Sequence, residues 1–317
     1  MIEKIRQLID KGNKFLITTH IDSDGDSLGS AFSMYYALEA LGKTATVFLK
    51  DPVPYMYEFL PKPLRTTHDF PVDQYDAIFV LDCGNLYRVG DGFERLKNLG
   101  VFINIDHHKT NETFGVVNLI DEGASSTAEI LYGLFCALKT QITFDMAINI
   151  YTAIVTDTGS FRYENTGSKA FLICEEMTRL GVKPSYVSQK VYENHPKERF
   201  LLTGLIFSTM ETYYKDRVAV ACVTEEMFKK TNTDKDYADG LVELIRGIRG
   251  VEVAILIREI NNQRYKLSMR SKGLVDVAVI CGFFGGGGHK NAAGCSIDGT
   301  LEEVKNKLKE CFAKEFI

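Results

Sequence analysis

The chain has 317 residues, of which 45% are hydrophobic and 25% are charged, and its formal net charge is -5. This composition is typical of a globular protein with about two domains. The negative net charge argues against binding along a long nucleic acid, because each bound phosphate needs a local Lys or Arg. No apolar run approaches the ~18 residues that a membrane span needs, and the N-terminal pattern indicates an amphipathic helix, not a signal peptide.

The first half of the chain alternates apolar runs with helical patterns. Four runs are expected to be strands, at residues 14–19, 44–49, 76–81 and 101–105. Helices are expected at residues 27–41, 126–139 and 144–155, where Ser126 and Glu129 have the spacing of a capping box. Nearly continuous apolar strands separated by helices predict an α/β fold, with a parallel sheet that carries helices on both faces.

The second half changes character. Further helices are expected at residues 169–180, 184–193 and 197–211, and the domain boundary near residues 194–196. We therefore expect a first domain over 1–193, a connecting helix over 194–210 and a second domain over 211–317. Strand patterns at 217–223, 251–259 and 265–270, with a closing helix from Leu301, predict that the second domain is a smaller mixed α+β domain.

Carboxylates and imidazoles follow the predicted strands. In open α/β sheets, functional residues gather beyond the carboxyl ends of the strands. These positions hold His20, Asp22, Asp24, Asp26, Asp82, Asp106, His107 and His108, and the helix at 144–155 leads into Asp157. Taken singly, Asp24 or Asp26 could cap a helix, and Asp82 or Asp157 could occupy a turn. Together they place so much negative charge at one edge that cations are needed, which predicts a divalent-metal site.

The ligand types indicate the metal. Aspartate oxygens with one or two imidazoles favour Mn²⁺, with Mg²⁺ or Co²⁺ as substitutes. Carboxylates this numerous can hold two ions with one aspartate bridging them. The seven cysteines are scattered and form no Cys-x-x-Cys pair, so they predict reduced thiols in a cytoplasmic protein and no zinc ribbon.

A run of four glycines, Gly285–Gly288, precedes His289 and Lys290. It is not a P-loop, because the GxxxxGK[ST] pattern is absent. A hinge or turn would explain the glycines alone. A loop whose backbone N–H groups approach an anion would also explain them, and Ser268 and Arg270 could add a hydroxyl and a guanidinium.

Together these segments resemble the DHH phosphoesterase superfamily, named for the triplet Asp106–His108. The motifs HIDSDGDSLGS, LDCGN, INIDHHKTN, SSTAE and TDTGSFRY match its catalytic domain, and SMRS with GGGGHKNAAG matches the DHH-associated C-terminal domain. Ser23 stands where many members carry proline. Within the superfamily the motifs are most similar to short two-domain bacterial nanoRNases that also dephosphorylate 3′-phosphoadenosine 5′-phosphate (pAp).

The resemblance implies residue roles. His20 and Asp24 would hold one metal, and Asp26, His107 and Asp157 the other, with Asp82 bridging both. His108 would face the scissile phosphate as a hydrogen-bond donor or general acid, so it and Asp82 are the expected catalytic residues. Asp22 and Asp106 would only orient neighbouring imidazoles. The expected substrate-binding residues, with the active site in the interdomain cleft, are Ser268, Arg270, Gly286, Gly287, Gly288 and His289.

The expected function is that of a two-metal, Mn²⁺-dependent phosphohydrolase. It would degrade very short oligoribonucleotides (nanoRNA) to mononucleotides and convert pAp, a nucleotide 3′,5′-bisphosphate, to AMP. The alternatives are a linear or cyclic dinucleotide phosphodiesterase, an exopolyphosphatase-like phosphatase and a non-catalytic RNA-binding module. No long nucleic acid and no membrane is expected as a partner, and the resemblance allows a homodimer.

Overall fold

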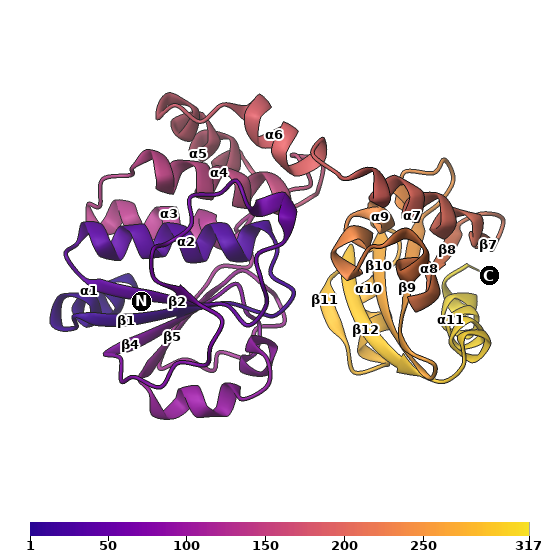
Figure 1. Cartoon of the computed structure of the whole chain (residues 1–317), viewed down its shortest axis with the longest axis horizontal. Coiled ribbons are helices and arrows are strands. Elements are labelled where there is room, and N and C mark those ends of the chain that lie inside the picture. Colours follow the sequence, from indigo (N-terminus) through magenta and orange to yellow (C-terminus); the bar gives the residue numbers. More distant parts are fainter. Residues whose placement is uncertain (317) are drawn as a thin grey trace. The chain divides into compact units, whose positions relative to one another are not determined.

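The computed structural model describes residues 1–316 and divides into two compact units, Met1–Asn194 and a second that begins at His195 (Figure 1). Each unit is built on its own six-stranded sheet. Within residues 1–316, no helix is both long and apolar enough to cross a membrane. All seven cysteines are free thiols.

The sheet of the first unit is entirely parallel, as the sequence predicts. Its strand order is β3-β2-β1-β4-β5-β6, and every pair runs in the same direction. The bounds are β1 Lys14–Thr18, β2 Thr44–Phe48, β3 Thr66–Thr67, β4 Ala77–Leu81, β5 Val101–Asp106 and β6 Val117–Ile120. The four predicted strands are therefore present, and the short edge strands β3 and β6 were not foreseen.

Helices cover both faces of this sheet, and they are of different kinds. Alternate strand residues point to opposite faces: Phe15 and Ile17 of β1 join one core cluster, whereas Leu16 joins another. The first cluster packs the α-helices, and the second packs the 3₁₀ helices η2 (Leu86–Val89) and η3 (Phe93–Asn98). The α-helices are α1 Ile2–Lys11, α2 Gly25–Ala40, α3 Thr127–Leu138, α4 Phe144–Asp157, α5 Ser168–Arg179 and α6 Pro184–Tyr192, and a further 3₁₀ helix, η1, spans Tyr55–Tyr57.

Helices α2 and α4 approach each other closely (Figure 1). A Cβ atom on Gly29 would lie 2.4 Å from the backbone oxygen of Asn149, and one on Gly25 would lie 2.3 Å from Oγ1 of Thr156. The two glycines are four residues apart, so they lie on one side of α2. Their missing side chains let the C-terminal turn of α4, which ends at Asp157, lie beside the N-terminal turn of α2.

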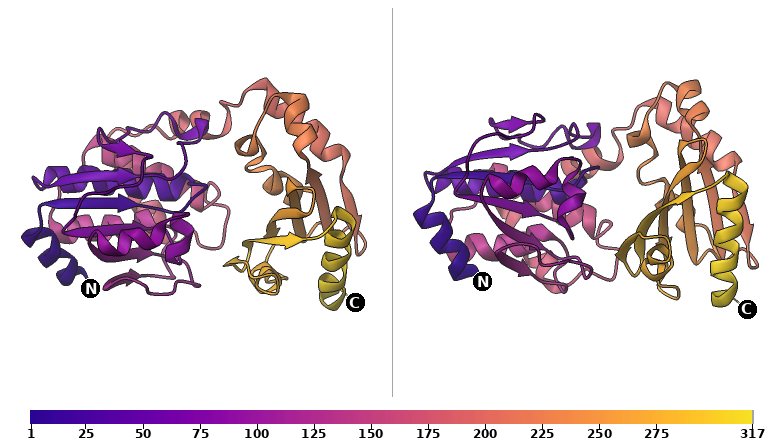
Figure 2. Two further views of the ribbon diagram at one scale, coloured as in Figure 1. Left: turned by 60° about the horizontal axis from the view of Figure 1, so that its bottom comes forward. Right: turned by 90° about the horizontal axis from the view of Figure 1, so that it is seen from below.

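The second unit has a mixed sheet with the order β11-β12-β10-β9-β8-β7, in which only β8 and β9 pair in parallel. Figure 2 shows this unit in salmon to yellow, from two further sides. Its strands are β7 Glu211–Tyr213, β8 Val218–Val223, β9 Val253–Asn261, β10 Arg264–Ser271, β11 Gly287–His289 and β12 Ala292–Asp298. One face packs on α10 (Val277–Gly282) and α11 (Leu301–Phe316), and the other on α7 (Lys197–Ser208), α8 (Glu225–Thr231) and α9 (Leu241–Arg246), near the 3₁₀ helix η4 (Lys235–Ala238). This is the mixed α+β arrangement that the sequence predicts, and its edge strands β7 and β11 and inner strand β12 were not foreseen.

Candidate metal and phosphate site

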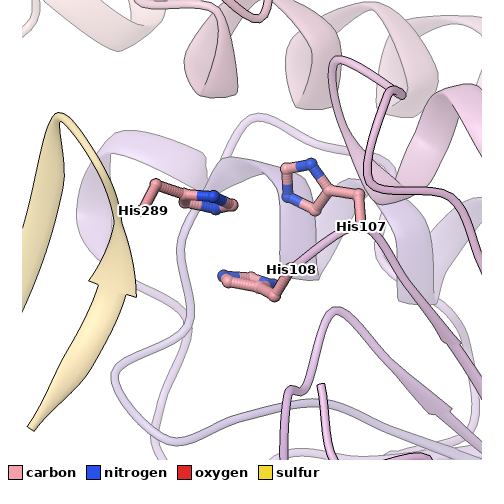
Figure 3. A group of neighbouring side chains, drawn as sticks. All are labelled: His107, His108 and His289. Carbon is pink, nitrogen blue, oxygen red and sulfur yellow. The ribbon is translucent and has the colours of Figure 1, made fainter. Parts of the chain in front are cut away.

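The acidic and imidazole residues of the first unit converge at one edge of the parallel sheet. His20 follows β1, Asp82 follows β4, and His107 and His108 follow β5. Because these three strands are neighbours and parallel, their carboxyl ends meet. Figure 3 shows the imidazoles of His107 and His108 side by side beyond the end of β5, with ring centroids 4.9 Å apart.

Asp82 lies at the centre of this group. It is 2% exposed and has a φ of 54°, a left-handed conformation that is costly outside glycine and is found at functional sites. Its Oδ2 is 3.5 Å from Nε2 of His20, and its Oδ1 is 3.6 Å from Nε2 of His107. The hydroxyl of Thr127 donates to the same Oδ1 at 3.0 Å. One carboxylate therefore turns its two oxygens toward two different imidazoles.

His20, Asp24 and Asp82 form the first potential ligand group. Nδ1 of His20 donates to the carbonyl of Ile21 at 2.7 Å, so Nε2 is the nitrogen left for a ligand bond. That Nε2 is 4.0 Å from Oδ1 of Asp24. Asp24 is also the N-cap of α2, where its carboxylate accepts the N–H of Ser27 at 3.0 Å. The cap role and a ligand role are thus compatible in one residue.

His107 lies at the centre of the second group. Its Nε2 is 3.6 Å from Oδ2 of Asp157, 3.6 Å from Asp82 and 3.8 Å from Oδ2 of Asp26, while its Nδ1 contacts the carbonyl of Ala124 at 3.3 Å. The three carboxylate distances exceed ordinary hydrogen bonds. They suit atoms that share an ion, because ligands about 2.0–2.2 Å from a metal lie about 3–4 Å from one another. The donor set therefore fits a divalent cation.

The N-terminus of α3 holds Asp26. The backbone N–H groups of Thr127 and Ala128 donate to its carboxylate at 2.7 and 3.1 Å, and the hydroxyl of Ser30 donates at 3.1 Å. The cap residue of α3 is Ser126, as the SSTAE pattern predicts, but the carboxylate of Glu129 accepts hydrogen bonds from Ser125 instead of closing a capping box on Ser126.

His108 is oriented by a buried carboxylate. Its Nδ1 donates to Oδ1 of Asp106 at 2.7 Å, and Asn111 donates to Oδ2 of Asp106 at 2.6 Å. Asp106 is fully buried and also accepts the backbone N–H of His107 at 2.8 Å. It therefore contacts the imidazole that the sequence expected it to orient. Asp22, expected in a similar role, is exposed, and its backbone N–H donates to Asp51 at 2.9 Å.

The pKa values of the site describe an excess of negative charge. Burial raises the pKa of Asp26 well above its usual value, and the charges of Asp82, Asp157 and Asp24 add to the rise. Burial also raises the pKa of Asp157 to about 6, against the lowering effect of His107. For Asp82, burial acts to raise the pKa, but the hydrogen bond and charge of His20 and the charges of the two neighbouring histidines outweigh it and the pKa falls.

The two histidines after β5 have raised pKa values. Burial lowers the pKa of His107, but the charges of Asp157 and Asp82 outweigh this effect. For His108, the lowering effect of burial is outweighed by the hydrogen bond that its ring donates to Asp106 and by the charge of Asp82. Protons thus supply part of the positive charge that the carboxylates require, and a divalent ion must displace them in order to bind.

We expect Mn²⁺ to raise the melting temperature more at pH 8 than at pH 5. The raised pKa values stabilise the metal-free fold fully below the unfolded pKa values; this contribution is lost as the pH rises through about 6 for Asp157 and above 6.5 for the histidines. The lowered pKa of Asp82 contributes stability above about pH 4, and this contribution is constant between pH 5 and pH 8.

Ligand at 100 times its Kd adds about 2.7 kcal/mol to the free energy of unfolding. Thermal denaturation at both pH values, with Na⁺ of matched ionic strength as control, measures the effect; an equal rise at both would contradict it.

In the second unit, the last two glycines of the run lie in a strand, and Gly285 and Gly286 lie in the connection that precedes it. Gly287–His289 is β11, an edge strand that pairs antiparallel with β12. A Cβ on Gly286 would lie 2.2 Å from the oxygen of Gly294, and Gly288 has a φ of +144° with its Cβ position 2.5 Å from the oxygen of Ala292. Only small residues on both sides permit this pairing. Gly287 is different, because nothing lies within 4 Å of its Cβ position.

Four of the six expected substrate-binding residues of this unit, Ser268, Arg270, Gly287 and His289, share one face of the sheet. His289 pairs with Ala292, and Ala292 pairs with Arg270, so the three lie in one row across β11, β12 and β10. Gly287, Gly294 and Ser268 form the next row. Paired residues in antiparallel strands point to the same face. On this face, the small residues Ala292 and Gly294 of β12 separate His289 from Arg270 and Ser268.

Arg270 is already engaged within its unit. Its Nε donates to Oε1 of Glu243 at 2.7 Å, and its guanidinium also donates to the carbonyl of Met269 at 3.0 Å. Burial acts to raise the pKa of Glu243, but the charge of Arg270 outweighs it and the pKa is lowered. The residue thus contacts a carboxylate, which the sequence did not indicate.

Sequence reasoning missed several supporting residues. Thr127 binds Asp82, Asn111 binds Asp106, and Asn165 donates to Oδ2 of Asp157 at 3.1 Å. Thr127 stands inside the SSTAE motif, directly after the N-cap of α3, and that place was a usable signal. The position of Asn165 in the turn after α4 carried no such signal.

The chain is similar to known proteins in both of its units. Residues 14–155 match the description "DHH family, N-terminal domain", and residues 215–314 match "DHHA1 domain". The chain is 33% identical over 304 residues to the bifunctional oligoribonuclease and PAP phosphatase NrnA of Thermus thermophilus, covering 94% of this chain and 89% of that protein. It is 25% identical over 306 residues to the NrnA of Bacillus subtilis, covering 93% and 95%.

A solved structure shares the fold along the whole chain. It is an exopolyphosphatase-related protein from Bacteroides fragilis, with a TM-score of 0.89 and 27% identity, covering 99% of this chain and 95% of that one. RecJ of Thermus thermophilus shares the fold with a TM-score of 0.56 at 16% identity, covering 99% of this chain and 54% of RecJ. From these matches and from the ligand groups around Asp82, the chain belongs to the DHH family of phosphoesterases.

Proposed function

We propose that this protein is a two-metal, Mn²⁺-dependent phosphohydrolase that degrades very short oligoribonucleotides to mononucleotides and converts pAp to AMP. The observation that carries the proposal is the placement of Asp82, whose two oxygens face His20 and His107 at 3.5 and 3.6 Å. One bridging carboxylate between two ligand groups is the arrangement that two-metal phosphoesterases use. The names of the relatives from Thermus thermophilus and Bacillus subtilis support the substrate class.

The ligand residues would be divided between two ions. His20 and Asp24 would hold one ion, and Asp26, His107 and Asp157 the other, with Asp82 shared. Oxygen donors mixed with imidazole favour Mn²⁺, with Mg²⁺ or Co²⁺ as substitutes. When bound, such ions lower the pKa of a coordinated water and neutralise charge on phosphate oxygens.

The chain's own residues would orient the substrate and supply a proton. Asp106 fixes the ring of His108 through Nδ1 at 2.7 Å, which leaves Nε2 of His108 as the atom that can reach a phosphate. The raised pKa of His108 favours its protonated form. Burial opposes this rise, and the hydrogen bond to Asp106 contributes to it. We infer that His108 donates a hydrogen bond to the scissile phosphate or a proton to the leaving oxygen.

The second unit offers a candidate site for a phosphate group. Ser268, Arg270 and His289 share a face of its sheet, with Gly287 among the small residues between them. The backbone N–H groups of Gly286 and of the edge strand β11, which contains Gly288, could add donors. One compact anion site suits a short substrate, because a long strand would need a row of cations.

Substrate length provides the test of this function. With Mn²⁺ present, we expect mononucleotide release from a diribonucleotide to exceed release from a strand of about 24 nucleotides by at least about tenfold, because the chain has a net charge of -5 and no long basic run. The panel also includes pAp, a cyclic dinucleotide and inorganic polyphosphate. Turnover of none of them would overturn the enzymatic proposal, and faster cleavage of the long strand would overturn the short-substrate assignment.

Polyphosphate hydrolysis is the second candidate function. It is favoured by the likeness, at 27% identity and a TM-score of 0.89, to a protein described as exopolyphosphatase-related. In the same panel, turnover of polyphosphate in preference to dinucleotide and pAp would select this function over the first.

A further inference from the structure

Arg88 occupies the turn that follows the strand leading to Asp82. It belongs to η2, whose cap residue Asn85 accepts the backbone N–H of Arg88 on its side chain at 3.3 Å. The carbonyl of Arg88 accepts the N–H of Ile21, the residue after His20, at 2.7 Å. The backbone of Arg88 is therefore tied to both segments that supply the first ligand group.

The guanidinium of Arg88 stands apart from the other arginines of the first unit. Its side chain is half-buried, yet within residues 1–316 it makes no hydrogen bond, ion pair or ring contact. Every other arginine of residues 1–194 has a partner, namely Arg6 with Glu3, Arg65 with Glu39, Arg95 with the ring of Phe70, Arg162 with the carbonyl of Gly159 and Arg179 with Glu175.

The charge of Arg88 acts on Cys83, the residue that follows Asp82. Burial raises the pKa of the Cys83 thiol to about 12, and Arg88 is the largest influence that opposes this rise. Cys83 is the neighbour of Asp82 in the chain, and its thiol donates to the carbonyl of Asn85 at 3.0 Å. The charge of Arg88 therefore reaches the residue next to Asp82, and the backbone hydrogen bonds of Arg88 to Ile21 and Asn85 fix the segment that carries it.

A half-buried guanidinium without a counter-charge is costly unless a ligand supplies the anion. Its planar donors match the oxygens of a phosphate, to which arginine binds through two parallel hydrogen bonds. Resting on the proposed phosphohydrolase function, we propose that Arg88 binds a non-bridging oxygen of the phosphate group that is held at the ligand groups around Asp82. Arg88 is then a catalytic residue of the first unit, in addition to His108.

The test compares Arg88→Gln and Arg88→Lys with Arg95→Gln, which removes one positive charge from an exposed arginine of η3 in the same unit. We expect Arg88→Gln to lower kcat/KM for diribonucleotide and pAp by about 10²–10³-fold, the usual cost of losing one donor to a developing oxyanion. Arg88→Lys should recover about tenfold of this loss, because it restores charge without the planar fork. Arg95→Gln should stay within about twofold of the wild type.

Two binding measurements separate this role from a structural one. The rise in melting temperature with Mn²⁺ should be the same in Arg88→Gln as in the wild type, since Arg88 is not a metal ligand. Binding of inorganic phosphate in the presence of Mg²⁺, measured by calorimetry, should weaken by at least about tenfold in Arg88→Gln alone. Loss of the Mn²⁺ effect, or phosphate binding and turnover that match Arg95→Gln, would overturn the assignment. If the wild type cleaves no substrate of the panel, the proposed function fails, whereas the phosphate measurement still decides the role of Arg88.

Discussion

Asp82→Asn is expected to lower hydrolysis of every substrate by at least about 10³-fold at saturating Mn²⁺, equivalent to about 4 kcal/mol of transition-state stabilisation. The amide keeps the size of the side chain and can still accept the hydroxyl of Thr127, which donates to Oδ1 at 3.0 Å. It removes the charge that two ligand groups share. Steady-state rates with diribonucleotide and pAp measure the loss, and Asp82→Ala should lose at least as much.

The control for this variant is Asp91→Ala, which removes an exposed aspartate from the same unit. It should leave the rates within about twofold, as surface substitutions usually do. Asn tolerates the left-handed backbone that Asp82 adopts, so Asp82→Asn is the variant that should fold like the wild type. Rates near those of the wild type in Asp82→Asn would mean that the catalytic ions are not held at this residue.

Gly29→Ala is expected to destabilise the protein by about 1–3 kcal/mol, the usual cost of overpacking a core. The new Cβ would lie 2.4 Å from the backbone oxygen of Asn149 and 2.9 Å from Cβ of Ala153, so α2 or α4 must move. Because α4 ends at Asp157, the same shift should weaken Mn²⁺ binding. Denaturant unfolding with and without Mn²⁺ measures both effects.

The matched control is Gly133→Ala, also in the interior of a helix of the first unit. Nothing lies within 4 Å of the Cβ position of Gly133 on α3, so this change should stabilise the fold by about 0.5–1 kcal/mol or leave it unchanged. Equal stability changes in the two variants would show that the close approach of α2 and α4 does not depend on Gly29.

The elements of the first unit could largely be predicted because their signals are local. Continuous apolar runs identified β1, β4 and β5, and the polar residues that end them are adjacent in the chain to the strands that place them. β6 was missed because only one of its four residues is buried, so the apolar pattern is weak. β11 was missed because its glycines have no side chains to show a pattern and suggested a loop.

The roles of Arg270 and Asp106 show where sequence reasoning ends. Asp106 stands inside the DHH triplet, and its hydrogen bond to His108 spans only two residues, so a local rule could foresee it. The contact of Arg270 with Glu243 joins β10 to α9 across 27 residues, and no sequence pattern encodes it. The same limit applies to Asn165, whose amide reaches Asp157 only because the turn after α4 folds back.

The sequence by itself determined which residues can carry the chemistry and on which edge of the sheet they lie, because strand direction and the order of polar residues are properties of the chain. Only the tertiary structure decided how those residues face one another. The two oxygens of Asp82 turn toward different histidines since its backbone adopts a left-handed conformation between β4 and η2. The missing side chains of Gly25 and Gly29 bring Asp157 to the site, because they let α4 pack against α2. Arg88 is a phosphate-binding candidate because its side chain has no partner among the described residues, whereas every other arginine of its unit has one. Packing decides which side chains meet, so this contrast is visible only in the tertiary structure.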